Sequence, residues 1–306
     1  MIIFNYLVFP GFLFAIIIGL LTVWYDRKIT ARVQWRVGPP WYQGFADILK
    51  LFAKETFIPA TAKRTGFVLA PFIGFSTALL VAAMLGVAGL YPKMSFTGDI
   101  IVLWYLLMIP SIAIIFGSSA SGNPISQVGS SREMKLFMSY ELPFVIILFS
   151  IAAKAHSLSI GGIIEYQRAN GANLWSLSGI IGFVVAIIST QAKLGLVPFD
   201  IPEAEGELAS GIMLEYSGSL LAIFKLMKAL LLYTLPLFLI TVFLGGMNLQ
   251  GFGILWFIIE YLLIVFIISL IRNTNPRLRI DQAMNLFWAI LTPLAILSGI
   301  LSYVGL

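Results

Sequence analysis

Carboxylates gather in one segment of the chain, residues 196–218, which reads LVPFDIPEAEGELASGIMLEYSG. Like charges held close together, and burial away from water, both raise the pKa of a carboxyl group toward neutral pH, where it can exchange protons. The segment also contains Pro198, Phe199, Ile201 and other apolar side chains, which favours a loop that dips into the protein over an ordinary hydrated acidic loop. The carboxylates predicted to exchange protons here are Asp200, Glu203, Glu205, Glu207 and Glu215.

Four more ionisable residues lie inside or beside long apolar stretches, namely Glu141, Lys225, Lys228 and Glu260. A charge at the centre of a membrane helix costs about 2.5 to 3.5 kcal/mol on insertion scales, so such side chains usually face a partner or a hydrated cavity. Lys225 and Lys228 are three residues apart and share a helix face, where the acidic loop or Glu141 would balance their charge. We expect all four residues to belong to a proton path, with purely structural pairing as the alternative.

Membrane helices are the elements that must position these groups. The chain has 306 residues, of which 59% are hydrophobic and only 11% charged, with a mean hydropathy of +0.97. A soluble domain carries roughly 25% charged residues, and a membrane-spanning helix needs roughly 20 apolar residues. The sequence therefore predicts an all-α polytopic membrane protein that forms a single integral membrane domain, residues 1–306. The eight stretches expected to span the bilayer lie at roughly 2–25, 67–90, 100–117, 136–153, 179–192, 214–243, 252–271 and 286–304.

The positions of lysine and arginine indicate the orientation of these spans. Loops that follow odd-numbered spans hold fourteen basic residues, whereas loops that follow even-numbered spans hold three. Because basic residues are retained on the cytoplasmic side, we expect a multi-pass protein of the plasma membrane with both termini outside.

An amphipathic helix is predicted after the first span. Phe45, Ile48, Leu49 and Phe52 recur at helical spacing, which is typical of a helix lying at the membrane surface. Such a helix serves either as a plain surface anchor or as a cavity wall and docking surface for a soluble partner. Its polar side carries Asp47, Lys50 and Lys54, and the basic segment before it carries Arg27, Arg32 and Arg36.

The chain has no cysteine and a single histidine. It therefore lacks the thiolates of an iron–sulfur cluster and a histidine pair for a haem. The sequence also contains no phosphate-binding glycine loop and no nucleophile elbow. We expect no catalytic, cofactor-binding or metal-binding residue in this chain, and no nucleic-acid partner.

Four sequence blocks together resemble a known family. They are YDRKITARVQWRVGPPWYQGFADILKLFAKE, SREMKLFMSYELP, VPFDIPEAEGELASGIMLEYSG and RNTNPRLRIDQAMNLFW, in that order along nearly the whole chain. This set resembles the subunit-1 (H-type) membrane protein of respiratory complex I.

The resemblance implies an eight-helix subunit at the junction of a peripheral redox arm and a membrane arm of antiporter-like subunits. Such a subunit relays the energy of electron transfer into ion pumping and has no redox centre of its own. By motif match, Glu141 and the five loop carboxylates would begin the proton-conducting axis. The basic segment with Arg27, Arg32 and Arg36 would face the peripheral arm, and we assign Asp47, Lys50 and Lys54 to the same interface.

Some departures indicate a branch within this family. Gly38-Pro39-Pro40 stands where quinone-reducing members usually have GPN, Lys228 replaces an acidic residue, and Asp26 replaces a glutamate. The run EYSGSLLAIFKLMKAL and the GPP turn look more similar to the corresponding subunit of energy-converting membrane-bound [NiFe] hydrogenases and their formate-hydrogenlyase and sulfur-reductase relatives. The resemblance then implies hydrogenase-like large and small subunits, an iron–sulfur subunit and antiporter-like membrane subunits as partners. The [NiFe] centre and the iron–sulfur clusters would belong to those partners.

Three functional hypotheses remain open at this point. The first is a coupling subunit of a hydrogenase-type or sulfur-reducing complex, which pumps protons or sodium. The second is the quinone-chamber subunit of a complex I-type dehydrogenase. The third is an autonomous ion transporter, which the large basic loop suited to a partner argues against.

Overall fold

The computed structural model describes residues 7–203, 207, 209, 211–248 and 251–305, and within these it is built from helices without strands. A π-helical turn, η5 (Leu286–Leu291), joins the last two helices. Short 3-10 helices are η1 (Pro92–Met94), η2 (Asn173–Trp175), η3 (Ile201–Glu203) and η4 (Gly211–Met213). The α-helices are α2 (Phe12–Val33), α3 (Gln43–Ala53), α4 (Arg64–Leu90), α5 (Asp99–Ala120), α6 (Pro124–Lys154), α7 (Ile160–Asn170), α8 (Leu177–Lys193), α10 (Gly218–Phe243), α11 (Gly253–Thr274), α12 (Ile280–Asn285) and α13 (Thr292–Val304).

The multi-pass membrane architecture is confirmed. Within the described residues, six helical segments are long and apolar enough to cross a membrane, namely α4, α5, α6, α10, α11 and the α12–α13 segment, and α8 is a shorter apolar helix. The first predicted span corresponds to α2, which begins at Phe12 and continues past residue 25 to Val33, while residues 2–6 of that prediction lie outside the described residues. This extension includes the charged residue Asp26, whose carboxylate is balanced by an ion pair with Arg272 of α11. The sixth predicted span was placed too early, since α10 begins at Gly218.

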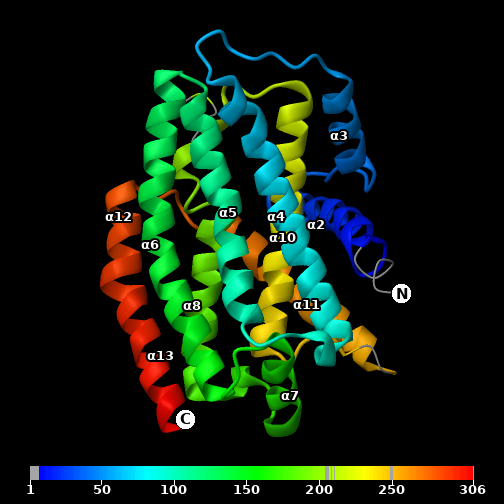
Figure 1. The fold of residues 1–306 in the computed structure, drawn as a ribbon, viewed down its shortest axis with the longest axis vertical. Helices are drawn as coiled ribbons and strands as arrows, with labels where there is room; N and C mark the ends of the chain where they lie inside the picture. The colour runs from blue at the N-terminus through cyan, green and yellow to red at the C-terminus, as the bar shows by residue number, and fades with distance from the viewer. Residues whose placement is uncertain (1–6, 204–206, 208, 210, 249–250, 306) are drawn as a thin grey trace.

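Helix α10 occupies the centre of the bundle (Figure 1). Its most apolar window is 94% buried, whereas the corresponding windows of α11 and the α12–α13 segment are 22% buried. A helix that is apolar on every side belongs in a core, and α10 packs against α4, α2, α3, α11 and α8. The last two segments therefore form the periphery that faces lipid or a partner subunit.

The predicted amphipathic helix is present as α3 and lies where α2 crosses α10. Gly19 permits this crossing, because a Cβ atom there would lie 3.0 Å from the Ala229 carbonyl oxygen. Ile48 packs into the crossing, against Leu20 and Ala229. Of the predicted apolar stripe, Leu49 and Phe52 remain exposed. Figure 1 shows α3 at one end of the molecule and α7 at the opposite end.

The end of the acidic loop is fixed to the bundle by Tyr216. Its ring stacks on Phe67 of α4, with the ring centroids 4.1 Å apart, and its hydroxyl donates to the Phe67 carbonyl oxygen at 3.1 Å. Gly117 of α5 leaves room for this hydroxyl. Burial raises the pKa of Tyr216, so the phenol stays protonated and keeps donating. The loop is thereby anchored just before α10 begins.

Candidate functional site

A chamber of about 470 Å³ lies where α2, α3 and α10 meet the chain between α8 and η3. Apolar side chains such as Leu20, Val23 and Leu232 form part of its wall. Charges of both signs form the rest, which makes the chamber a polar space inside an apolar bundle. The charged lining residues are Asp26, Arg27, Asp47, Asp200, Glu203, Lys225, Lys228, Arg272 and Arg277.

One wall of the chamber is fixed by Asp26 of α2. Its Oδ2 accepts a hydrogen bond from Arg272 Nη1 at 2.6 Å, and its Oδ1 accepts one from Ser269 Oγ at 2.8 Å. Asp26 is only 3% exposed, so both carboxylate oxygens need such partners. This pair joins α2 to α11.

The acidic loop forms a second wall through Asp200. Its Oδ2 lies 2.7 Å from Arg277 Nη2, and the Leu278 amide donates to the Pro198 carbonyl oxygen at 3.0 Å. The loop before η3 is therefore tied to the chain that follows α11. The other carboxylate oxygen, Asp200 Oδ1, is buried without a hydrogen-bond partner among the described residues.

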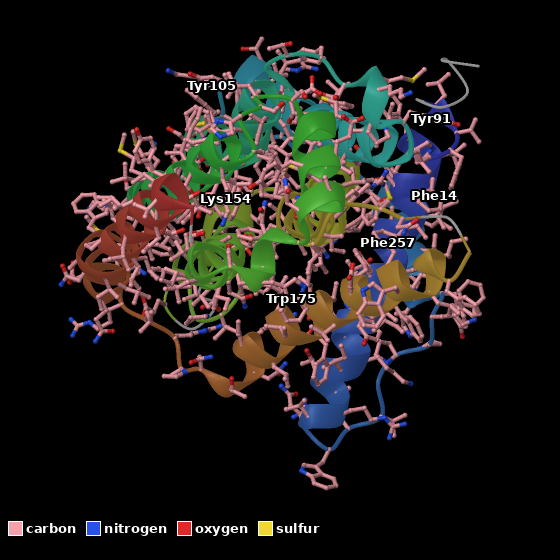
Figure 2. All side chains as sticks on the ribbon, turned by 90° about the horizontal axis from the view of Figure 1, so that it is seen from below. Phe14, Tyr91, Tyr105, Lys154, Trp175 and Phe257 are labelled. Atoms are coloured by element: carbon pink, nitrogen blue, oxygen red, sulfur yellow. The ribbon has the colours of Figure 1, made fainter. Side chains whose placement is uncertain are left out.

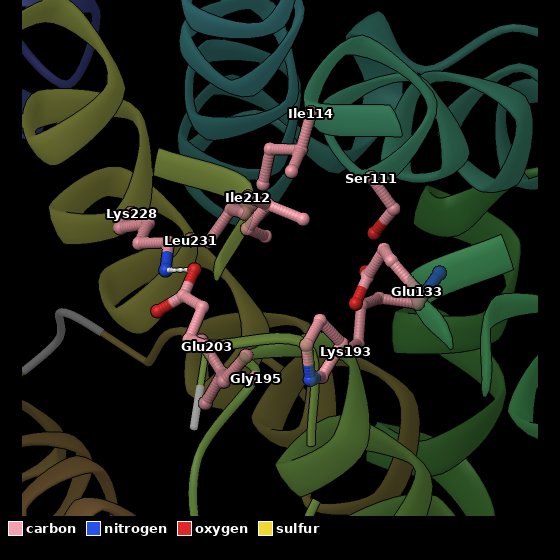
Figure 3. Close-up of a pocket in the computed structure, with 11 residues that line it drawn as sticks. Ser111, Ile114, Glu133, Lys193, Gly195, Glu203, Ile212, Lys228 and Leu231 are labelled. Atoms are coloured by element: carbon pink, nitrogen blue, oxygen red, sulfur yellow. Dashed lines mark hydrogen bonds and ion pairs between the residues drawn. The ribbon is translucent and has the colours of Figure 1, made fainter. Parts of the chain in front are cut away.

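Glu203 and Lys228 form an ion pair at the inner boundary of the chamber. Both side chains also line a second, much smaller cavity of about 20 Å³. Figure 3 shows this pair facing Glu133 and Lys193 across the small cavity. A space of this size has room for about one water molecule. The pair therefore lies between the open chamber and a closed interior space.

Glu133 of α6 is a buried carboxyl on the far side of the small cavity. It is 7% exposed and makes no hydrogen bond or ion pair with a described residue. Its side chain faces Glu203 and Lys228 across the cavity (Figure 3). Because a buried carboxylate without a partner is costly, the charge state of Glu133 depends on that neighbouring pair.

Glu141 lies two helical turns farther along α6 and is paired with Lys193, the last residue of α8. Lys193 Nζ lies 2.8 Å from Glu141 Oε2, and Trp104 Nε1 of α5 donates to Glu141 Oε1 at 2.6 Å. The ammonium also lies over the rings of Tyr140 and Phe144. Lys193 lines the small cavity as well.

These groups form a series that runs from the chamber into the bundle. It starts at Glu203 and Lys228, crosses the small cavity to Glu133, and continues to Lys193 and Glu141. No group of three or more His, Cys, Asp or Glu side chains in the described part of the chain is arranged to hold a metal ion. The arrangement is suited to moving protons and charge.

The model of the NADH dehydrogenase family matches residues 6–303. The chain belongs to the NADH dehydrogenase subunit 1 family. It is 35% identical over 314 aligned residues to the H-type subunit of the NADH-quinone oxidoreductases of Bacillus thuringiensis (strain Al Hakam) and Bacillus cereus (strain AH187), an alignment that covers 95% of this chain and 92% of each relative.

A solved structure of the membrane-bound sulfane sulfur reductase, an archaeal respiratory membrane complex, matches with a TM-score of 0.87. That match has 26% sequence identity and covers 95% of this chain and 96% of that one. The protein is thus a membrane protein of the complex I type, similar to the H-type subunit, and its relatives are subunits of multi-subunit respiratory membrane complexes.

In this family member, the predicted site residues fall into separate groups. The acidic loop does supply the partner of Lys228, whereas Glu141 is paired with Lys193 instead. Lys225 is exposed and lines the chamber. Glu205 lies outside the described residues.

Two of the loop carboxylates lie away from both the chamber and the small cavity. The exposed Glu207 pairs with Arg132 at 2.6 Å, and the hydrogen bond from Arg132 holds the pKa of Glu207 below its usual value. Glu215 Oε1 accepts a hydrogen bond from Asn123 Nδ2 at 2.5 Å. Both bonds tie the loop to the start of α6.

Glu260 is remote from the series. It lines a third cavity, of about 770 Å³, together with Gln167 and Arg168 of α7. Since α7 and α3 lie at opposite ends of the molecule (Figure 1), this cavity is separate from the chamber. The structure does not bring Glu260 together with the other predicted residues.

Two residues of the predicted partner interface, Arg27 and Asp47, line the chamber. Arg27 Nη1 donates to Asp47 Oδ2 at 3.0 Å, and Gln43 Nε2 donates to Asp47 Oδ1 at 2.8 Å. Burial by itself would raise the pKa of Asp47, but the hydrogen bonds from Arg27 and Gln43 outweigh it and hold the pKa below its usual value. The remaining members, Arg32, Arg36, Lys50 and Lys54, are exposed.

The sequence patterns assigned no site role to Glu133, Lys193 or Trp104, and Trp104 was interpreted as an interfacial or packing aromatic. Glu133 had a signal, since it precedes Tyr140 by seven positions and Glu141 by eight, which places all three toward one side of α6. Lys193 was counted only as a loop charge, although it comes at the end of an apolar stretch. Trp104 had no such signal, because its contact with Glu141 depends on how α5 packs against α6.

Proposed function

We propose that this chain is the membrane subunit that couples electron transfer in partner subunits to proton or sodium movement in antiporter-like subunits, within a complex of the [NiFe] hydrogenase type. It acts as one integral membrane domain without a redox centre. The similarity to a subunit of a respiratory sulfur reductase complex and the GPP turn at residues 38–40 support this branch. Its partners are hydrogenase-like large and small subunits and an iron–sulfur subunit, which carry the [NiFe] centre and the clusters, together with the antiporter-like subunits.

The observation that carries the proposal is the series of ionisable side chains between the chamber and Glu141. The change of charge or conformation that accompanies electron transfer in a partner subunit acts first at the chamber, at the edge of the bundle. The series of side chains then transmits its electrostatic effect into the bundle. Two ion pairs and one carboxyl without a partner make the series responsive, because moving one charge changes the balance at the next.

The mechanism follows from these contacts. When the acidic loop moves and Glu203 leaves Lys228, the ammonium of Lys228 loses its counter-charge and favours the ionised form of Glu133. Glu133 then releases its proton into the small cavity. The new negative charge of Glu133 attracts the ammonium of Lys193 and thereby weakens the ion pair between Lys193 and Glu141. Glu141 is thereby free to take up a proton beside α5.

The exposed basic face near the chamber is the docking surface for the peripheral subunits. Arg32, Arg36, Lys50 and Lys54 lie there, and Arg27 with Asp47 fixes α3 beneath it. The excess of basic residues in these loops supports a cytoplasmic position for this face at the plasma membrane, with both termini outside.

The test is to extract the protein in mild detergent with its partners, then assay the complex for nickel and for ferredoxin-dependent hydrogen evolution. We expect both. Absence of nickel with partners still bound would contradict the hydrogenase assignment and move it to a sulfur- or quinone-reducing complex. Intrinsic redox activity of the isolated chain would contradict the coupling role itself.

A second candidate is the quinone-chamber subunit of a complex I-type dehydrogenase, favoured by the 470 Å³ chamber and by relatives that carry the name of an NADH-quinone oxidoreductase. The many charged side chains of the chamber wall make it less suited to an apolar isoprenoid chain. A photoreactive quinone analogue that labels α3 or α10 in the intact complex would support this candidate, and absence of labelling would reject it.

A further inference from the structure

The third cavity, of about 770 Å³, lies at the α7 end of the molecule and takes no part in the proposed coupling series. The end of α4, the end of helix α7, the chain that follows α10 and the first half of α11 line it. Its volume falls in the range of small-molecule sites. Its wall combines one exposed guanidinium, that of Arg168, with a long apolar surface.

The polar end of this cavity is held rigidly. Gln167 Nε2 donates to the Thr241 carbonyl oxygen at 3.0 Å, and Asn173 Nδ2 donates to the Val242 carbonyl oxygen at 3.1 Å. Both bonds satisfy carbonyl groups at the end of α10. Arg168 Nη2 donates to the Met247 carbonyl oxygen at 3.0 Å, which fixes the guanidinium while its other nitrogens remain available as donors.

The apolar wall runs along α11. From Trp256 to Ile264 the helix rises by about 12 Å, and Phe257 and Leu263 line the cavity between them. Trp256 and Trp175 are 65% and 83% exposed. Figure 2 looks onto this end of the molecule and labels Trp175 and Phe257 of this wall. Exposed tryptophans beside an apolar surface are typical of the headgroup level of a membrane.

We propose that this cavity binds a glycerophospholipid, with its phosphate at Arg168 and one hydrocarbon chain along α11 between Trp256 and Ile264. A guanidinium matches phosphate geometry better than a point charge does. The weak burial of α11 leaves the apolar wall open to the surrounding lipid. The carboxyl of Glu260 also lines the cavity, from the same helix as the apolar wall.

Native mass spectrometry of the delipidated complex tests the site. The probes are phosphatidylglycerol and monogalactosyldiacylglycerol, which has similar chains but no phosphate. We expect the wild type to retain phosphatidylglycerol about tenfold more strongly, the scale of one charge-assisted hydrogen bond. Arg168→Gln should abolish this preference, and Arg168→Lys should keep part of it.

Two further variants distinguish recognition of the phosphate from a general loosening of the cavity. Lys93→Gln removes an exposed charge of η1, which packs against α7 outside the cavity, and should keep the preference. Leu263→Trp places a larger side chain in the apolar wall. It reduces the space for a hydrocarbon chain and should lower retention of both lipids.

Two outcomes would overturn the lipid site. The first is equal retention of the two lipids by the wild type. The second is a loss of both lipids in Arg168→Gln without a change in preference, because Arg168 would then act only through its bond to Met247.

Discussion

Lys193 and Glu141 are 52 positions apart in the chain, yet their side chains form an ion pair of 2.8 Å with exposed fractions of only 1% and 9%. The pair joins the end of α8 to the middle of α6, and Trp104 of α5 donates to the same carboxylate. A charge pair this deeply buried is a weak source of net stability, but breaking it leaves one charge uncompensated.

Lys193→Met is therefore expected to lower the free energy of unfolding by about 3 to 5 kcal/mol. The double variant Lys193→Met/Glu141→Gln should recover part of that loss, because no buried charge is left alone. Denaturant unfolding of the purified protein in detergent measures both, and a double-mutant cycle gives the coupling. Additive effects of the two substitutions would mean that the pair is not energetically coupled.

Glu141→Gln is expected to leave the complex assembled, although less stable because Lys193 loses its counter-charge, while stopping ion pumping. The amide oxygen still accepts a hydrogen bond from Trp104, but the group no longer ionises. Ion uptake by reconstituted vesicles, measured beside the redox activity of the complex, separates the two effects. The family match predicts the same result for Glu205→Gln. Wild-type pumping in both variants would refute the proposed path.

Glu133→Gln should lower ion transport by about a hundredfold, the typical contribution of one positioned proton-transfer group. Assembly should be retained, because Glu133 makes no hydrogen bond or ion pair with a described residue. The matched control is Glu165→Gln, which alters an exposed carboxylate of α7 that lines neither the chamber nor the small cavity. Equal transport by the two variants would remove Glu133 from the series.

Acidification is expected to loosen α3 from the chamber wall. The pKa of Asp47 is lowered from its ordinary 3.8, so the stabilisation by Arg27 is fully present above about pH 4 and is lost as the pH falls through the lowered value. The side chains of this pair are 44% and 32% exposed, so its contribution is under about 1 kcal/mol.

The measurement uses the absence of native cysteine. A dye attached to Lys50→Cys on α3 should gain mobility in fluorescence anisotropy as the pH is lowered from about 6 to about 3. In the background of Asp47→Asn the dye should already be mobile at neutral pH. A pH-independent signal in both backgrounds would show that Asp47 does not hold α3.

The family blocks and the apolar stretches were sufficient to predict the membrane architecture and the amphipathic helix. The boundaries of α2 and α10 were predicted less well, because hydropathy ignores pairing. Asp26 is tolerated within α2 only because Arg272 and Ser269 of α11 satisfy it. In the same way, residues 214–217, which the predicted span included, are held outside α10 by the contact of Tyr216 with Phe67.

By itself the sequence determined which residues are ionisable and that they lie beside apolar helices, because composition and periodicity are local properties of the chain. Only the tertiary structure decided their partners. It paired Lys228 with Glu203 and Lys193 with Glu141, and it placed Glu260 in a separate cavity at the α7 end. The physical reason is that the balance of a buried charge depends on atoms brought close by helix packing, and these atoms lie on segments far apart in the chain.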